Sequence, residues 1–200
     1  FPCLAAAIFG VMLVMPNIKK SVELQNDVTI PRKNEMEKLH IENTVYYATD
    51  SKNRVSTITA DSVDEMAPTS KEVKINTPKA DISTDNGNIK VSADTGFFNQ
   101  EKNILKLQQN VNALDEKGTK IKTLAAEYDF TKEYGHGNER LNAEGDWGDL
   151  EAQGFEFFKT TNILVLKGKH VVTTSQGTLT ADIETRYFQN AHKSVSIGNV

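Results

Sequence analysis

The chain has 200 residues and a net charge of −4, with 38% hydrophobic and 25% charged residues. This composition suits one globular domain or two small ones. An acidic chain without a cluster of Lys and Arg argues against nucleic acid as the main partner. The single cysteine, Cys3, cannot form an internal disulfide and so does not report the redox compartment.

The N-terminal segment is apolar. Residues 1–15, FPCLAAAIFGVMLVM, carry no charge. A helix of this length spans about 23 Å, less than the roughly 30 Å hydrocarbon core of a bilayer. Two interpretations stay open: the core of a signal peptide that is removed, and the remainder of a transmembrane anchor. No small-x-small cleavage site follows, which favours the anchor. We expect an anchor over residues 1–16, a polar linker over 17–37 and a domain over 38–200 on the far side of a membrane.

From about residue 38 onward, apolar and polar residues alternate with a period of two, as in Ile89-Lys90-Val91-Ser92. Such alternation predicts β-strands with one buried and one wet face. Turn-forming residues separate the segments at 85–88, 115–118, 135–138 and 175–177. Because these gaps are too short for helical crossovers, the strands are predicted to be antiparallel. No helix is predicted after the anchor, so the fold class is all-β: a sandwich, barrel or roll.

The chain repeats itself. The phrases ILKL and ILVL begin 59 residues apart, at Ile104 and Ile163, and each follows an Asn and an aromatic segment that we expect to form a turn. Each is followed by a Gly turn and then by a Thr-rich phrase, at 123–127 and 178–182, with an earlier copy at 57–61. Gln109 and Gly168 share the same offset. Three phrases in one order predict stacked β-hairpin units. The alternative is chance similarity among strand-rich segments.

Four longer phrases resemble a known family. The segments TITADS (57–62), KVSADTGFFNQEKNILKLQQNV (90–111), GTKIKTLAAEYDF (118–130) and DLEAQGFEFFKTTNILVLKGKHV (149–171) are similar to the LptA/LptC β-jellyroll family of lipopolysaccharide export. An apolar anchor, a linker and one such domain resemble the family's inner-membrane branch. The resemblance implies an open antiparallel β-jellyroll built of similar hairpin repeats, with one N-terminal transmembrane helix. It also implies an apolar groove that holds the acyl chains of lipopolysaccharide.

The resemblance implies a location and partners as well. The chain would span the inner membrane once, with its C-terminal domain in the periplasm. It would receive lipopolysaccharide from the transmembrane subunits of an ATP-binding-cassette transporter, which it contacts through its anchor and N-terminal edge. It would pass the lipid through its C-terminal edge to the soluble periplasmic bridge protein LptA. Two alternatives remain: a soluble bridge member of the same family, and a structural β-scaffold that binds no lipid.

Alternation selects the apolar residues that would line the groove, although each could instead belong to the core of a closed sandwich. The inward candidates are Ile89, Val91, Leu105, Leu107, Val111, Leu150, Phe157, Leu164, Leu166, Leu179 and Ile183. Unpaired edge strands can bind a partner by β-augmentation. We expect the N-terminal edge near residues 38–48 and the C-terminal edge in a strand over 178–188. The edge candidates are Leu39, Ile41, Val45, Thr180, Asp182 and Glu184.

No pattern predicts catalysis. The four histidines, His40, His136, His170 and His192, do not stand at metal-ligand spacing, and no Cys pair accompanies them. His136 lies between two glycines and is predicted to occupy an exposed loop. No Ser-His-Asp arrangement or pair of catalytic carboxylates is apparent. The sequence therefore predicts a protein that is not an enzyme and that needs no cofactor or metal.

Overall fold

The computed structural model describes residues 40–49, 54–66, 71–84, 87–158, 160–188, 191 and 193–199. The predicted anchor and linker lie outside these residues. The described part forms one antiparallel sheet with no α-helix, and no helix in it is long and apolar enough to cross a membrane. Its strands are β1 (His40–Thr49), β2 (Val55–Glu65), β3 (Glu72–Asn76), β4 (Lys79–Thr84), β5 (Gly87–Ser92), β6 (Thr95–Asn99), β7 (Ile104–Asp115), β8 (Lys120–Asp129), β9 (Tyr134–Gly137), β10 (Leu141–Gly145), β11 (Gly148–Phe158), β12 (Ile163–Thr174), β13 (Gly177–Ala181), β14 (Glu184–Phe188) and β15 (Lys193–Ile197).

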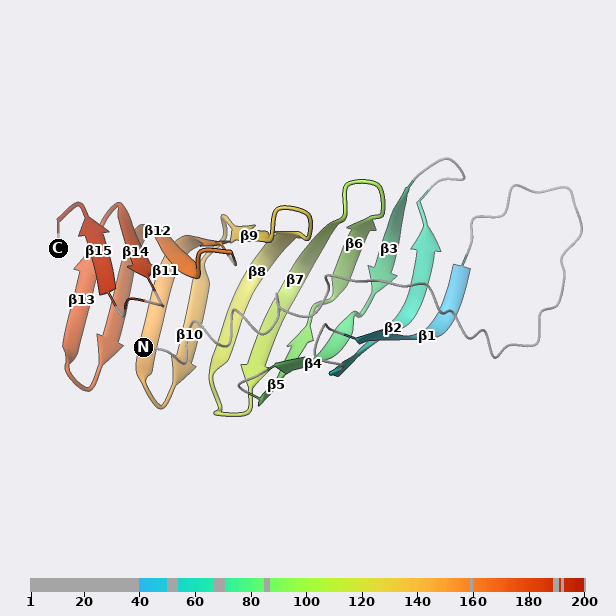
Figure 1. Ribbon diagram of the computed structural model, residues 1–200, viewed down its shortest axis with the longest axis horizontal. Helices are drawn as coiled ribbons and strands as arrows, with labels where there is room; N and C mark the ends of the chain where they lie inside the picture. The colour runs from blue at the N-terminus through green and yellow to red at the C-terminus, as the bar shows by residue number, and fades with distance from the viewer. Residues whose placement is uncertain are drawn as a thin grey trace, which may run out of the picture.

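The sheet is folded along its length into two walls. The long strands β2, β7, β8, β11 and β12 pair with different partners in their two halves; β7, for example, pairs with β6 over residues 104–108 and with β5 over 112–115. We call the half that contains β4, β5, β10 and β13 wall 1, and the half that contains β3, β6, β9, β14 and β15 wall 2. In both walls the strands follow one another along the long axis, from β1 at one end to the C-terminal strands at the other (Figure 1). The predicted all-β antiparallel fold is confirmed and is consistent with a β-jellyroll.

A crease joins the two walls. Where the strands change partners, the backbone takes positive φ at Asn43 (50°), Gln109 (63°), Asn110 (50°) and Gly168 (67°). Such residues bend a strand sharply, as β-bulges do. Backbone hydrogen bonds bridge the bend, since Gly168 N donates to Ile183 O at 2.8 Å. Gln109 and Gly168 share an offset because both form the bend.

The 59-residue repeat is present in the structure. β7 and β12 are both 12 residues long and begin 59 residues apart. Each is preceded by an Asn with positive φ, Asn103 (56°) and Asn162 (55°), because Asn tolerates the left-handed turn conformation. The aromatic segments before them are strands, namely β6 and the last residues of β11, and not the predicted turns. The turns follow one step later, at residues 100–103 and 160–162.

The third repeated phrase is not equivalent in all its copies. Residues 57–61 and 178–182 both run along wall 1 to the crease, whereas residues 123–127 of β8 cross into wall 2. The strand predicted over 178–188 is broken at Asp182 and Ile183, so that β13 stays in wall 1 and β14 begins in wall 2. The prediction of stacked hairpins is thus confirmed for the first two phrases only.

The predicted turn at 135–138 is largely a strand. Gly135 and Gly137 lie in β9, opposite Phe157 and Phe155 of β11. A Cβ atom on Gly137 would lie 2.5 Å from Cε1 of Phe155, so the phenyl ring covers this glycine. The glycines therefore make room for aromatic side chains instead of forming a loop. The half-buried His136 between them faces the opposite side of wall 2.

Candidate functional site

The inner face of wall 2 carries two rows of side chains, which the strand register defines. Between β3 and β14 neither row contains a charged residue. The rim row is Val73, Phe98, Leu105, Tyr128, Gly135, Phe157, Leu164 and Tyr187; the crease row is Ile75, Gly96, Leu107, Ala126, Gly137, Phe155, Leu166 and Thr185.

The inner face of wall 1 has the same character. Its middle row is Ile58, Ala80, Val91, Ala113, Ile121, Ala143, Leu150, Val172 and Leu179. All of the predicted groove residues except Ile183 lie on these two inner faces. Ile183 is 59% exposed in the break between β13 and β14, because the backbone there leaves the strand and the alternation with it.

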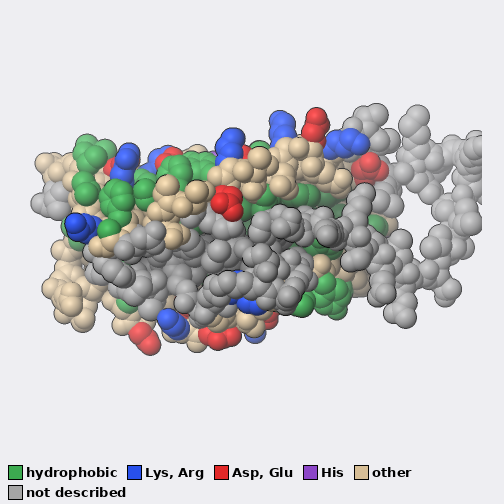
Figure 2. Space-filling view, viewed as in Figure 1, with side chains coloured by type: hydrophobic (Ala, Val, Ile, Leu, Met, Phe, Trp, Pro, Cys, Tyr) green, Lys and Arg blue, Asp and Glu red, His purple; other side chains and the backbone are tan. Residues whose placement is uncertain are grey.

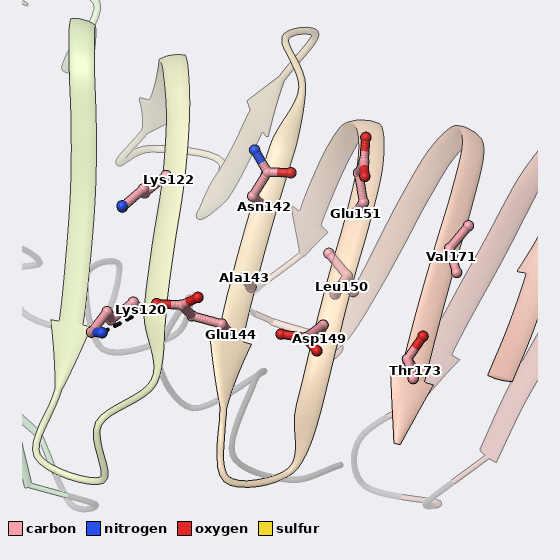
Figure 3. Close-up of a pocket in the computed structure, with 10 residues that line it drawn as sticks. All are labelled: Lys120, Lys122, Asn142, Ala143, Glu144, Asp149, Leu150, Glu151, Val171 and Thr173. Atoms are coloured by element: carbon pink, nitrogen blue, oxygen red, sulfur yellow. Dashed lines mark hydrogen bonds and ion pairs between the residues drawn. The ribbon is translucent and has the colours of Figure 1, made fainter. Parts of the chain in front are cut away.

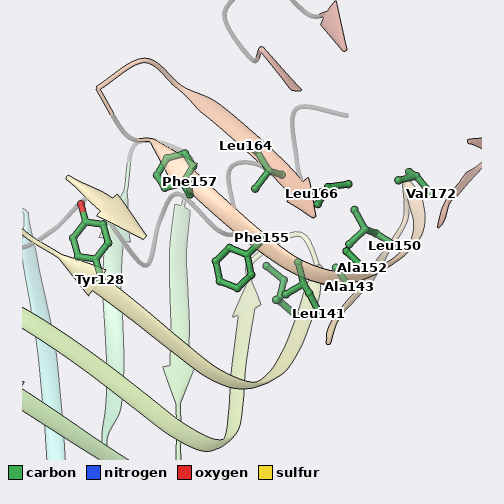
Figure 4. Packing of buried hydrophobic residues seen from close by; sticks show 11 residues of the cluster. Tyr128, Leu141, Ala143, Leu150, Ala152, Phe155, Phe157, Leu164, Leu166 and Val172 are labelled. Atoms are coloured by element: carbon green, nitrogen blue, oxygen red, sulfur yellow. The ribbon is translucent and has the colours of Figure 1, made fainter. Parts of the chain in front are cut away.

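The interior is filled toward the C-terminal end. Phe157 is 0% exposed, Leu164 2% and Leu166 4%, and they belong to one buried cluster. This cluster joins residues of both walls, for example Leu141 of β10 and Phe155 of β11, which lie close together in Figure 4. At this end the predicted groove residues Leu150, Phe157, Leu164 and Leu166 are therefore core residues.

The interior is less filled toward the N-terminal end. There the apolar side chains of wall 2 are only partly buried, and Leu107 packs against a small cluster on wall 1 formed by Ile82, Ile89 and Val91. In Figure 2, charged side chains border the visible face, and apolar ones show between them. Alternation alone did not select the half-buried residues Ile41, Val63, Val73, Ile75 and Phe98, which lie on the same inner face. Phe98 was missed because its segment was interpreted as a turn.

Both ends of the sheet have edge strands. β1 pairs only with β2, so the candidates Ile41 and Val45 lie in an edge strand, whereas Leu39 is outside the described residues. At the other end β13 pairs only with β12, and β15 only with β14.

The C-terminal edge candidates need correction. Thr180 lies in the edge strand β13, but Asp182 lies in the break after it. Glu184 lies in β14, which pairs with β12 on one side and with β15 on the other. It is therefore not at the edge, because the chain continues for one more strand than the alternation predicted.

An ion pair ties the N-terminal edge strand to its neighbour. His40 Nδ1 contacts the Asp64 carboxylate across β1 and β2, and Asn76 Nδ2 donates to Asp64 Oδ2 at 2.6 Å. The hydrogen bond to Asp64 raises the pKa of His40 above its ordinary value of 6.5, and the same bond lowers the pKa of Asp64 below 3.8. Both groups are exposed, so the pair contributes little at high salt.

The pH dependence of this contact follows from the two directions. The stabilisation from His40 is complete below pH 6.5 and is lost as the pH rises through the raised pKa; that from Asp64 is present above pH 3.8 and is lost as the pH falls through the lowered pKa. We expect an NMR titration of His40 to give a pKa above 6.5 that falls in the Asp64→Asn variant. The same pKa in both proteins would contradict the pairing.

A buried histidine holds the two walls together at the C-terminal end. His170, in β12, is 1% exposed, and its Nδ1 lies 2.8 Å from Gly168 O. A carbonyl oxygen only accepts, so Nδ1 carries hydrogen. Its Nε2 lies 2.6 Å from Thr185 Oγ1 of β14, which in turn lies 2.8 Å from Ser196 Oγ of β15. Both ring nitrogens are thus occupied, and no group of His, Cys, Asp and Glu among the described residues could hold a metal.

A polar hollow lies outside the interior. It measures about 430 Å³ and lies over the outer face of wall 1 (Figure 3). Its lining mixes both signs of charge, with Lys120 Nζ 3.1 Å from Glu144 Oε1, and includes Lys122, Asp149 and Glu151. These side chains alternate with the inward residues of the same strands. The hollow is therefore separate from the apolar inner faces and offers no surface for an uncharged chain.

The comparison with protein families agrees with an apolar interior between two β walls. The family model described as "Lipopolysaccharide-assembly, LptC-related" matches residues 3–176, which is most of the chain and includes β1 to β12. No curated protein matches the chain. Members of this family are transport and binding components. The chain therefore belongs to the LptC-related family of lipopolysaccharide-assembly proteins and is a component of lipopolysaccharide transport.

Proposed function

We propose that the chain is a lipopolysaccharide-binding protein, anchored in the inner membrane by residues 1–16, with its β domain in the periplasm. It receives lipopolysaccharide from an ATP-driven transporter, which it contacts through its anchor and β1. It passes the lipid to the soluble bridge protein LptA through its C-terminal edge. The observation that carries the proposal is the uncharged, half-buried inner face of wall 2 near Ile75 and Leu107.

The physical chemistry of acyl chains suits this surface. Each methylene that leaves water for an apolar surface contributes about 0.8 kcal/mol, so several acyl chains together bind strongly without a single polar contact. The sugars and phosphates of the lipid stay in water, since charged groups on an uncharged inner face would lose their hydration. Transfer of this kind makes and breaks no bond. It needs no catalytic group, and the proposal includes none.

The edges suit a relay of β domains. An edge strand leaves N–H and C=O groups free for a strand of another protein. β1 offers ten residues on the side that faces away from β2. At the opposite end β13 and β15 offer five residues each, one in each wall. The two ends differ in length and continuity, which allows different partners to bind at each end.

A transfer assay in proteoliposomes tests the proposal. They hold the transporter and the full chain, with LptA outside. We expect lipopolysaccharide to reach LptA only when both ATP and the chain are present. Single proline substitutions at Val195 and Ser196 of β15 test the edge, because successive N–H groups of a strand point to opposite sides. The variant that loses a free N–H is expected to take up lipid and to transfer little of it.

Two outcomes of this assay contradict the proposal. Transfer that does not depend on the chain would leave it without a role in the relay. Transfer from a chain that lacks residues 1–16 and is free in solution, at the same rate as from the full chain, would instead favour the soluble bridge member of the family.

A further inference from the structure

We propose that the acyl chains occupy only the N-terminal half of the interior, between β2 and β8, and that Phe155 and Phe157 close the other half. This inference rests on the proposed function and locates the lipid within it. It starts from the 59-residue repeat, because two copies of one unit can be compared position by position.

One position distinguishes the two copies. Gly96 of β6 pairs with Leu107 of β7, and Phe155 of β11 pairs with Leu166 of β12. Both residues of the second pair lie 59 positions after those of the first. The same slot in the crease row of wall 2 therefore holds a hydrogen atom in one copy and a benzyl group in the other. In the rim row the copies agree, with Phe98 and Phe157.

The benzyl group fills the second copy. Phe155 and Leu166 are both buried in the cluster that also contains Leu141 of the facing wall. In Figure 4 the Phe155 ring points toward Leu141 across the interior. Protein interiors packed in this way leave no room for a second hydrocarbon. The C-terminal half therefore cannot accept an acyl chain without displacing these side chains.

The first copy lacks this filling. Its Leu107 is half-buried, and so are Ile75 and Phe98 beside it. A Cβ on Gly96 would lie 3.4 Å from both Ile75 Cβ and Leu107 Cδ2, so a side chain placed there would project between them into the interior. Gly96 does not have positive φ, so its backbone does not require glycine. The glycine thus keeps space free that the second copy uses for packing.

The chemistry of the lining selects the occupant. The inner residues of wall 2 from β3 to β8 carry no charge, and their polar atoms are limited to the Tyr128 hydroxyl. A peptide strand or a sugar would leave its polar groups unpaired against this surface. A hydrocarbon chain loses nothing there and gains the transfer free energy of its methylenes. The half-buried surface between β2 and β8 therefore fits acyl chains.

Photocrosslinking in intact cells tests the location with the full, anchored chain. Probes at Ile75 and Leu107 are expected to form lipopolysaccharide adducts, and a probe at Leu166 is not. Gly96→Phe places the second copy's side chain in the first copy. It is expected to reduce adducts at Ile75 about tenfold or more, the equivalent of about 1.4 kcal/mol. Thr95→Phe, the neighbouring change on the outer face, is the matched control and is expected to leave them unchanged.

The outcomes separate this inference from the proposed function. Equal adducts at Leu107 and Leu166, or unchanged adducts in a folded Gly96→Phe variant, would overturn the inference and leave lipid binding established. Absence of adducts at every probe would overturn both. Crosslinks from Leu107 to residues 1–16 of the same chain would show that the space belongs to the chain's own apolar segment. Phe155→Ala, which empties the second slot, is expected to produce adducts at Leu166.

Discussion

Replacement of Phe157 by alanine is expected to destabilise the domain by about 3–5 kcal/mol, the usual cost of removing a phenyl ring from a packed core. The side chain is 0% exposed and lies in the cluster that joins the two walls. Because a domain of this kind is stable by only about 5–15 kcal/mol, the variant loses a large part of its stability. Urea unfolding of the purified domain measures the loss as a shift of the transition midpoint.

The neighbouring residue supplies the control. Phe158 is 37% exposed on the opposite face, where its ring lies 5.0 Å from that of Tyr134. Phe158→Ala is expected to cost about 1 kcal/mol, since it removes mainly one aromatic contact. Equal losses in the two variants would mean that the interior between the walls is not packed at this end.

Replacement of Leu107 by aspartate is expected to remove lipid binding and to leave the domain folded. The side chain is half-buried, so a carboxylate at this position remains hydrated when no lipid is present. An acyl chain would have to cover the carboxylate, and desolvation of an unpaired charge costs several kcal/mol. Binding is therefore expected to fall by a factor of about 100 or more, measured as lipopolysaccharide that copurifies with the chain.

Two further variants show whether the effect depends on position. Gln108→Asp adds the same charge at the next residue, which is exposed on the outer face, and is expected to leave lipid binding unchanged. Leu166→Asp, at the equivalent position of the second copy, is expected to unfold the domain because Leu166 is buried in the filled half. A folded Leu166→Asp variant that also loses lipid would place the lipid in both halves.

Alternation and turn chemistry were sufficient to predict the strands and their antiparallel pairing. The period of two around Ile89 and Ile104, with short Gly-containing turns, leaves no other connection, and the offset between Ile104 and Ile163 identified the repeat. These signals are local, since each depends on a few neighbouring residues. The family resemblance added the function, which no spacing of residues in this chain indicates.

The bend and the filling of the interior could not be predicted in the same way. Gln109 and Asn110 take positive φ although neither is glycine, so nothing local marks the crease there. The break at Asp182 and the strand that contains Gly135 and Gly137 also depend on distant partners. Whether an inward residue lines a space or fills a core depends on the facing wall; Leu107 and Leu166 are identical in sequence terms and differ in burial.

The claim that the interior takes up lipid is tested most directly by photocrosslinking in intact cells at two adjacent residues of β7. Leu107 lies on the inner face, and Lys106 on the outer face, where its Nζ is 3.2 Å from Glu127 Oε2. The account predicts lipopolysaccharide adducts from a probe at Leu107 and none from a probe at Lys106. A folded, membrane-bound protein that forms adducts at neither residue, or equally at both, would contradict it.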